Sequence, residues 1–242
     1  MTAHSCLHQA VDLLRPASRI TVFSGCELSE ASGIPDPHAV DESWTKDALR
    51  HVSGHGMRDN PAAIVNFWKK RVIPIRRARP NAGHRALARL SRTHQVMHIT
   101  HSVDGLLGRA GADDVLELHG CYLRWRCDHC SLRSGPWPGM RCPQCYRLVR
   151  PDVVLPGELT DARLMKRAQL SAEACDVLLV AGSIADSQLA TSLVEIARSA
   201  NRKVICVGAS AGMPGSPGDV ALEGKLEDVL PELQLALMGA GR

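Results

Sequence analysis

The sequence predicts an α/β fold in which helices cover both faces of a parallel sheet, with a small helical insert and a zinc-ribbon insert. Two observations lead to this prediction. Five short β-branched runs alternate with helical patterns, and four cysteines form two CxxC pairs. Continuous apolar strands that alternate with helices are typical of a sheet that is buried on both faces.

The predicted elements follow one another along the chain. We expect strands at Ile20–Phe23, Val96–Thr100, Val115–Leu118, Val177–Ala181 and Val204–Val207. Helical patterns lie between several of them, at His84–Leu90 and Leu189–Arg198. The segment LEDVLPELQLALM predicts a closing helix that is interrupted, or begins, near Pro231.

Two segments break this rhythm and define the expected parts of the chain. Residues 36–79 carry helical stretches instead of strands, so we expect a helical insert over the carboxyl end of the sheet. Residues 121–149 hold the CxxC pairs and form the expected zinc module. The sheet domain is then expected from residues 1–35, 80–120 and 150–242 together.

The composition is that of an ordinary globular protein. The 242 residues are 45% apolar and 22% charged, with a net charge of +4. These values favour a solvated surface over a nucleic-acid partner. The N-terminus lacks the long apolar core of a signal peptide, and no apolar run approaches the length of a membrane span. We therefore expect a soluble, cytoplasmic protein without a membrane or nucleic-acid partner.

Four of the nine cysteines have metal-ligand spacing. Cys127, Cys130, Cys142 and Cys145 form C-x2-C-x11-C-x2-C, whereas the other five are scattered. An odd number of cysteines in a chain without a secretion signal argues against a disulfide framework. Because each CxxC knuckle presents two thiolates from one tight turn, the doubled motif predicts a tetrahedral, structural zinc site. A redox CxxC or a chance pairing is the alternative.

The stretch after the first predicted strand has the pattern of a nucleotide-binding turn. The run Ile20–Phe23 ends in Ser24-Gly25, and a polar segment then leads to SGIPD. A strand, a glycine turn and a helix start together hold a pyrophosphate on backbone N–H groups. Glu27 places a carboxylate in this turn, where a phosphate would be repelled.

The order of motifs resembles that of the sirtuin family, NAD-dependent protein-lysine deacylases. The motifs are SGCELSEASGIPD, PNAGHRALARL, THSVDGLLGRAG, LELHG, the two CxxC knuckles, RPDVVLPGE, LLVAGS and GKLEDVLPEL. The resemblance covers residues 20–233 and implies a Rossmann-type domain with a helical insert and a zinc-ribbon insert. It also implies that NAD lies across the carboxyl ends of the strands, and that an acyl-lysine protein or peptide enters between the modules.

The resemblance assigns the chemistry to two residues. In the family's reaction the acyl oxygen attacks the ribose carbon that bears nicotinamide. A histidine then acts as general base on a ribose hydroxyl, and the acyl group ends on ADP-ribose. His119 matches this histidine, and an imidazole accepts a proton near neutral pH. Asp104 matches the aspartate that holds the nicotinamide carboxamide. From the residues alone, a structural histidine and a helix N-cap are the alternatives.

The implied cofactor-binding residues follow several of the predicted strands. After the first strand they are Ser24, Gly25, Cys26, Glu27, Ser29, Ile34, Pro35, Asp36 and His38. After the later strands they are His101, Ser102, Asp104, Gly182, Ser183 and Gly208.

Several positions depart from the family's motifs. Gly-Ala-Gly reads Gly25-Cys26-Glu27, Asp-Phe-Arg reads Asp36-Pro37-His38, and Thr-Gln-Asn reads Thr100-His101-Ser102. Phe-Gly-Glu reads Pro156-Gly157-Glu158, Gly-Thr-Ser reads Gly182-Ser183-Ile184, and an Asn is Gly208. Each lost hydrogen bond to a charged ligand weakens binding by about 1.5–3 kcal/mol. Protonation of His38 or His101 would compensate for the lost cation.

The implied acyl-substrate residues include one pair that bears on specificity. In NPAAIVNFWKKRVIP, Trp68 and Arg71 stand where the branch acting on succinyl- and malonyl-lysine carries a Tyr and an Arg. Arg71 is suited to clamp an acidic acyl group through two hydrogen bonds. A packed Trp68 and a solvated Arg71 are the alternative. The other implied residues are Val154, Pro156, Gly157 and Glu158.

Three functions remain open from the sequence. The first is an active NAD-dependent deacylase with a preference for acidic acyl groups, which the retention of His119 and Asp104 favours. The second is a catalytically impaired sirtuin-like binding or regulatory protein, and the third is a protein ADP-ribosyltransferase. A nucleic-acid-binding zinc ribbon is disfavoured because the net charge is slight.

Overall fold

The computed structural model describes residues 3–34, 72–135, 141–155, 158–183, 187–209, 211 and 218–239. Most of the predicted helical insert, 36–79, lies outside the described residues. Its last part is helical at residues 72–77. There Val72 and Ile75 are buried against the predicted zinc module, in one cluster with Tyr122, Trp125 and Val149.

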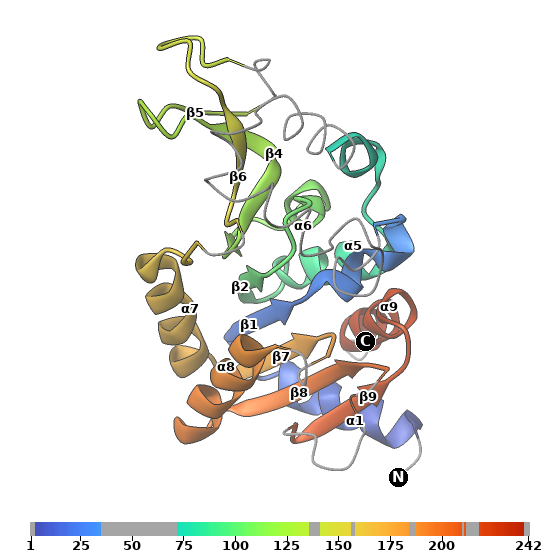
Figure 1. The fold of residues 1–242 in the computed structure, drawn as a ribbon. Helices are drawn as coiled ribbons and strands as arrows, with labels where there is room; N and C mark the ends of the chain where they lie inside the picture. The colour runs from blue at the N-terminus through green and yellow to red at the C-terminus, as the bar shows by residue number, and fades with distance from the viewer. Residues whose placement is uncertain are drawn as a thin grey trace.

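The main sheet has six strands, all parallel, in the order β3-β2-β1-β7-β8-β9 (Figure 1). The strands are β1 Arg19–Ser24, β2 Gln95–Thr100, β3 Val115–Glu117, β7 Val177–Ala181, β8 Lys203–Gly208 and β9 Val220–Glu223. All five predicted strands are found in this sheet. The sequence did not predict β9, because four residues at a sheet edge, of which only two are buried, give a weak pattern.

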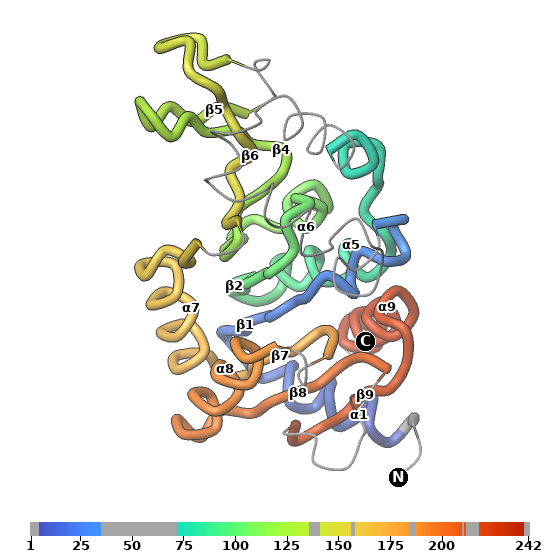
Figure 2. Tube along the Cα trace, viewed as in Figure 1, coloured from blue at the N-terminus to red at the C-terminus, as the bar shows by residue number. Residues whose placement is uncertain are grey.

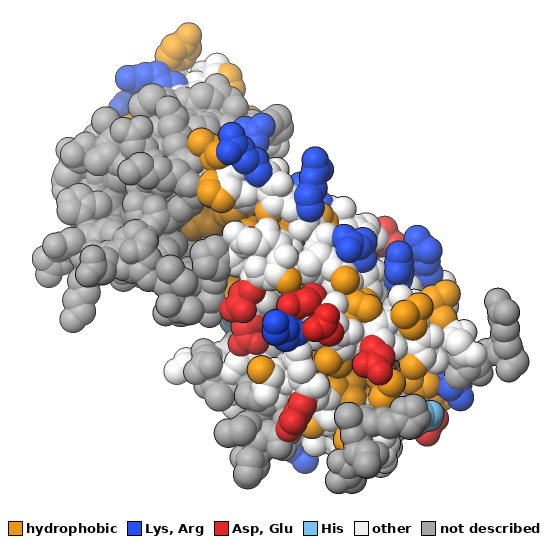
Figure 3. All heavy atoms as spheres, turned by 90° about the vertical axis from the view of Figure 1, so that its right-hand side faces the viewer, with side chains coloured by type: hydrophobic (Ala, Val, Ile, Leu, Met, Phe, Trp, Pro, Cys, Tyr) orange, Lys and Arg blue, Asp and Glu red, His pale blue; other side chains and the backbone are white. Residues whose placement is uncertain are grey.

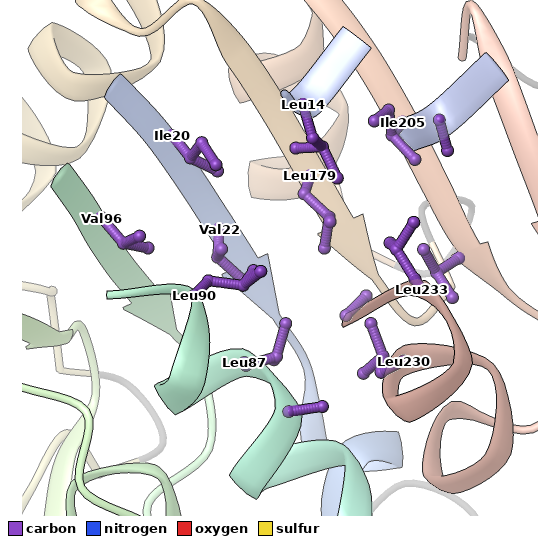
Figure 4. Close-up of a cluster of buried hydrophobic side chains, with 14 of the residues drawn as sticks. Leu14, Ile20, Val22, Leu87, Leu90, Val96, Leu179, Ile205, Leu230 and Leu233 are labelled. Atoms are coloured by element: carbon purple, nitrogen blue, oxygen red, sulfur yellow. The ribbon is translucent and has the colours of Figure 1, made fainter. Parts of the chain in front are cut away.

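Helices cover both faces of the sheet, as predicted. One face carries α1 Ala3–Leu14, α5 Ala82–Leu90 and α9 Leu226–Gly239, and the other carries α7 Ala162–Ala174 and α8 Gln188–Ser199 (Figure 1). Alternate strand residues supply the two cores, since neighbouring side chains point to opposite faces. Thus Val22 packs with the first group and Phe23 with the second. Figure 4 shows Leu87, Leu230 and other members of the first core.

The closing helix differs in detail from the prediction. α9 begins at Leu226 and continues through Pro231 without interruption. A proline inside a helix removes one backbone hydrogen bond. Burial of Leu226, Leu230 and Leu233 against the sheet offsets this loss, because each buried leucine contributes about 1.5–3 kcal/mol. The last helix also lies against the first, α1 (Figure 2).

A second, antiparallel sheet has the order β5-β4-β6, with β4 Gly120–Arg126, β5 Arg133–Ser134 and β6 Arg150–Val153. It lies at the opposite end of the molecule from β9 (Figure 2). Its core includes Trp125, Cys127 and Cys142. Two further short elements are the 3-10 helix η1 Cys26–Ser32, which contacts α9, and the helix α6 Leu106–Arg109, which contacts α5. The three-part division of the chain stays a prediction.

The strand order determines where a ligand can lie. From β1 the chain proceeds to β2 and β3 on one side, and later from β7 to β8 and β9 on the other. The loops that follow β1 and β7 therefore turn away from each other at the carboxyl edge of the sheet. In open α/β sheets, ligands bind in the crevice at such a switch point.

The face of the molecule in Figure 3 carries charged side chains of both signs. Basic side chains are spread along one side of this face, and several acidic side chains gather nearer its centre around a basic one. Among the described helices, none is long and apolar enough to cross a bilayer.

Candidate active site and zinc centre

The carboxylate of Glu27 bridges the switch point. Glu27 lies in η1, directly after β1, and Ser183 follows β7. The Ser183 N–H lies 3.0 Å from each of the two Glu27 carboxylate oxygens and donates to them. The Glu27 carboxylate, which the sequence places in the cofactor turn, is thus held by the backbone of the turn that follows β7. A charge-assisted bond of this kind is one of the stronger hydrogen bonds in proteins.

Glycines end the three central strands at this edge. Gly25 follows β1, Gly182 follows β7, and Gly208 ends β8. Gly182 has a φ of +118°, and a Cβ there would lie 3.1 Å from a Glu27 carboxylate oxygen. Only glycine therefore permits both the backbone conformation and the approach of Glu27. A Cβ on Gly25 would meet nothing described within 4 Å, so there is space beside the first turn.

Asp104 is buried, and its carboxylate accepts three hydrogen bonds. Oδ1 accepts from the N–H of Leu106, which begins α6, at 2.7 Å. The N-cap of α6 is Gly105, so Asp104 is not the helix N-cap that was the alternative from sequence, although it binds the first N–H of the helix. Oδ2 accepts from Ser29 Oγ at 2.6 Å and from Ser102 Oγ. Because a carboxylate has about four lone-pair sites, capacity for one further donor remains on Oδ1.

His84 extends this network. Asn81 caps α5, and its backbone N–H donates to His84 Nδ1 at 3.4 Å. Burial lowers the pKa of His84 to about 4, so the imidazole is neutral at pH 7. With Nδ1 accepting, Nε2 carries the proton and points to Ser29 Oγ at 3.4 Å. Each group therefore donates a hydrogen bond to the next. The Asn81 N–H donates to His84 Nδ1, His84 Nε2 donates to Ser29 Oγ, and the Ser29 hydroxyl donates to Asp104.

A small pocket lies beside this network. Its polar lining includes Ser24, Ser29, Thr100, Ser102 and Asp104. The Oγ of Ser24 is buried and has no hydrogen-bond partner among the described residues. Since buried polar groups normally have partners, the unpaired hydroxyl indicates a site for a ligand or water.

His119 lies between the two sheets, stacked on His101. The ring centroids are 4.6 Å apart with an interplanar angle of 18°, and Phe23 contacts His101 edge-on. Burial lowers the pKa of His101 to about 4, with a further contribution from the charge of His119. His101 is therefore neutral at pH 7 and does not supply the compensating cation. Burial also lowers the pKa of His119.

The backbone on either side of His119 is fixed by β6. The Val154 N–H donates to the His119 carbonyl at 2.9 Å. Gly120 has a φ of +79°, and a Cβ there would lie 2.0 Å from the Asp152 carbonyl oxygen. The glycine after His119 is therefore required for the close approach of β4 and β6. This pairing brings the predicted substrate residue Val154 beside the predicted base.

Glu158, also a predicted substrate residue, is held in ion pairs. Arg150 is 2% exposed and donates to Glu158 Oε1 at 2.6 Å and to Asp128 Oδ2 at 2.7 Å. Arg126 lies 3.6 Å from Glu158 as well. The other carboxylate oxygen of Glu158 accepts from the Leu155 N–H at 2.9 Å. These bonds anchor the segment after β6 to the first CxxC knuckle, which contains Asp128.

The remaining predicted site residues divide into two groups. Cys26 and Ile34 are half-buried in and after η1, and Ile34 packs against the core of the small sheet. The others lie outside the described residues: Pro35, Asp36, His38, Trp68, Arg71, Pro156 and Gly157.

The four CxxC cysteines converge on one point. The sulfur atoms of Cys127, Cys130, Cys142 and Cys145 all lie within 4.8 Å of one another. Two of the separations, Cys127–Cys145 and Cys130–Cys142, are 3.5 Å. A tetrahedral zinc with Zn–S bonds of about 2.3 Å requires sulfur separations of about 3.8 Å. The cluster therefore fits a structural zinc ion.

The two knuckles have the same backbone conformation. In each, the residue after the second cysteine has a positive φ of 59°, Ser131 in the first and Tyr146 in the second. Its N–H donates to the carbonyl of the knuckle's first cysteine at 2.9 Å. Two segments distant in sequence adopt the same turn because each must present two sulfurs to one centre.

These features agree with comparisons to known proteins. Residues 25–188 match the model of the Sir2 family. An NAD-dependent protein deacylase of Thermococcus kodakarensis is 33% identical, with 94% of each chain covered. NAD-dependent protein deacylase 1 of Pseudomonas aeruginosa is 32% identical and covers 94% of this chain and 97% of its own.

Solved structures give the same result. A Sir2 homolog–NAD complex has a TM-score of 0.84 at 29% identity, covering 96% of this chain and 94% of its own. Sir2Af2 bound to a myristoylated histone peptide has a TM-score of 0.75 at 29% identity, with 98% of each chain covered. The chain belongs to the Sir2 family, the sirtuins.

Two residues of the site were not among the sequence candidates. His84 connects to Asp104 through Ser29, and Arg150 links the knuckle to Glu158. The spacing N-x-x-H at Asn81 resembles a capping box and is the available signal for His84. Arg150 is the first residue of the motif RPDVV. Because arginines are mostly exposed, nothing in the sequence indicated that it is buried.

Removal of one zinc ligand tests the metal centre. We expect Cys142→Ser to lower the zinc content well below the wild-type value of about one per chain, because structural zinc sites need all four ligands. The loss should also expose Trp125, which is 2% exposed in the folded module. Metal analysis and fluorescence quenching measure both effects. Cys6→Ser, which alters a half-buried cysteine on α1, is the control. Full zinc content in Cys142→Ser would contradict the assignment.

Proposed function

We propose that the chain is an NAD-dependent protein-lysine deacylase that transfers an acyl group from lysine to ADP-ribose and releases nicotinamide. The observation that carries this proposal is the position of His119. Its imidazole lies between the two sheets, with its backbone fixed by β6 and its ring stacked on His101. The similarity to NAD-dependent protein deacylases supports the reaction class.

The cofactor site is proposed at the switch point. NAD, when bound, supplies the ribose carbon that accepts the acyl group and nicotinamide as leaving group. The glycine-lined turns after β1, β7 and β8 leave backbone accessible for its phosphates. The unpaired Ser24 hydroxyl and the free capacity of Asp104 Oδ1 are the groups suited to its polar parts.

His119 is the proposed general base. Because burial lowers its pKa, the imidazole is neutral at pH 7 and can accept a proton from a hydroxyl within reach. The stacked ring of His101 restricts the orientation of His119. His101 is itself neutral, so it adds no positive charge beside the base.

The proposed substrate is an acyl-lysine protein or peptide. Val154 lies beside His119 and has its N–H on the His119 carbonyl, so an extended peptide along this segment would lie next to the base. Glu158 supports the segment through Arg150. We further infer a preference for acidic acyl groups from Arg71, which lies outside the described residues. A cytoplasmic location is inferred because an odd number of cysteines, nine, argues against a disulfide framework.

The Glu27–Ser183 contact favours one alternative, a catalytically impaired sirtuin-like protein. A carboxylate on the β7 turn opposes a phosphate at the same place. Protein ADP-ribosyl transfer remains a second alternative that uses the same site. Labelled NAD distinguishes these cases, because transfer leaves the label on protein and an impaired protein leaves NAD intact.

Replacement of the proposed base tests the function. With zinc-loaded protein, NAD and peptides carrying acetyl-, succinyl- or myristoyl-lysine, we expect peptide-dependent nicotinamide release. His119→Ala should reduce this release by about 100- to 10,000-fold, the usual contribution of general-base catalysis. His8→Ala, at an exposed position of α1, is the matched control. The ranking of the three peptides tests the acyl preference. Absence of release from every peptide by the wild type would overturn the proposal.

The pH dependence tests the state of His119. A base is active when neutral, so activity is complete above its pKa and is lost as the pH falls through that pKa. Because burial lowers the pKa of His119 from 6.5, the acid limb of kcat/KM should lie below pH 6.5. A pH series on peptide-dependent nicotinamide release measures it. An acid limb clearly above pH 6.5 would show that the free enzyme's base is not this buried histidine.

A further inference from the structure

We propose that Glu27 is an internal competitor for the cofactor's phosphate, and that it sets the affinity of the site for dinucleotides. The inference rests on the proposed function, because it concerns the cofactor of that reaction. From the sequence alone, we expected only that Glu27 repels the ligand. Here the carboxylate acts as a bound anion that the ligand must displace.

Glu27 makes a specific contact with Ser183 across the switch point. Both carboxylate oxygens of Glu27 lie 3.0 Å from the Ser183 nitrogen, on the far side of the switch point. Glu27 is half-buried, and Gly182 leaves room for its carboxylate where a Cβ would crowd it. The side chain therefore occupies a specific position on the β7 turn.

A carboxylate and a phosphate are chemically equivalent as acceptors for the Ser183 N–H. A backbone N–H beside a glycine of positive φ, at the carboxyl end of a parallel strand, is a group that binds anions. A carboxylate oxygen and a phosphate oxygen carry the same sign of charge and accept the same hydrogen bond. Two separate anions at the Ser183 N–H would repel each other, so binding of one opposes binding of the other.

The contact between Glu27 and Ser183 is reversible. The backbone of η1 is fixed, because Leu28 and Ser29 are buried and the Asn81 side chain donates to the Leu28 carbonyl at 2.7 Å. The Glu27 carboxylate can leave the Ser183 N–H by rotation of the side chain about its own bonds. The space above Gly25 lies on the same turn and remains available to a ligand. Among the described residues of these turns, the Glu27 side chain is therefore the group that we propose obstructs the ligand.

Ligands with and without phosphate separate competition from a general change in the site. The probes are ADP, which carries phosphates, and adenosine, which carries none, measured by calorimetry on zinc-loaded protein. Glu27→Gln keeps the side-chain shape and removes the charge, and Glu27→Ala removes the contact. We expect both variants to bind ADP about tenfold more tightly or better, about 1.4 kcal/mol, with adenosine binding unchanged.

The matched control is Glu30→Gln. Glu30 lies in the same 3-10 helix, is exposed, and loses the same charge on substitution. We expect its ADP affinity to equal that of the wild type, which separates local competition from the change in net charge. Thermal unfolding of each variant verifies that the fold is kept. If Glu27→Ala does not fold, Glu27→Gln alone gives the result.

The Ser183 amide gives a direct second readout. Its NMR resonance should move on Glu27→Gln, and hydrogen exchange at this amide should be faster in free Glu27→Ala than in free wild type. On addition of ADP, the wild-type resonance should move again as phosphate replaces carboxylate. An ADP affinity that is equal in wild type and both Glu27 variants would overturn the inference, and so would an equal gain for adenosine.

The ligand-binding and NMR measurements use no acyl peptide, whereas the proposed function is measured by peptide-dependent nicotinamide release. Failure of the inference can therefore be distinguished from failure of the proposed function. Tighter ADP binding by Glu27→Gln, without peptide-dependent nicotinamide release by any form, supports the inference and removes the deacylase. Release by the wild type that depends on His119, with no gain in ADP binding on Glu27→Gln, keeps the deacylase and removes the inference.

Discussion

The reversal of strand order between β1 and β7 is the constraint on which the rest of the structure depends. It separates the loops after two adjacent parallel strands and opens the carboxyl edge of the sheet at one place. Gly25, Gly182 and Gly208 end the strands at this edge, and Asp104 and His119 follow the strands on one side of it. The Glu27–Ser183 bond closes the same gap. We infer that the chain keeps the architecture of a cofactor site and fills one position of it with its own carboxylate.

The site also depends on groups that are kept neutral. His84 and His101 both have a pKa of about 4 because they are buried, and burial lowers the pKa of His119 as well. Three imidazoles near the site therefore add no positive charge at pH 7. These imidazoles therefore do not attract an anionic cofactor, whereas the Ser183 backbone N–H is a described group that binds an anion. In our proposal, the occupant of that N–H sets the affinity.

Local patterns were sufficient to predict much of the molecule. The apolar runs gave the five central strands, and the CxxC spacing gave the cysteine cluster. Features that join distant segments could not be predicted in this way. The Glu27 carboxylate meets an N–H 156 residues away, and a pattern within one turn indicates only that a charge is present. Burial of His101 likewise comes from tertiary packing, so its neutrality was not apparent from a protonatable side chain in a cofactor motif.

The most direct test is a crystal structure of the zinc-loaded chain with NAD. We expect NAD across the carboxyl ends of β1 and β7, with a phosphate oxygen within about 3 Å of the Ser183 nitrogen. The Glu27 side chain should be turned away from that nitrogen, and the Asp104–Ser29 bond should be kept. A complex in which NAD occupies the switch point while Glu27 still accepts from the Ser183 N–H would contradict the account.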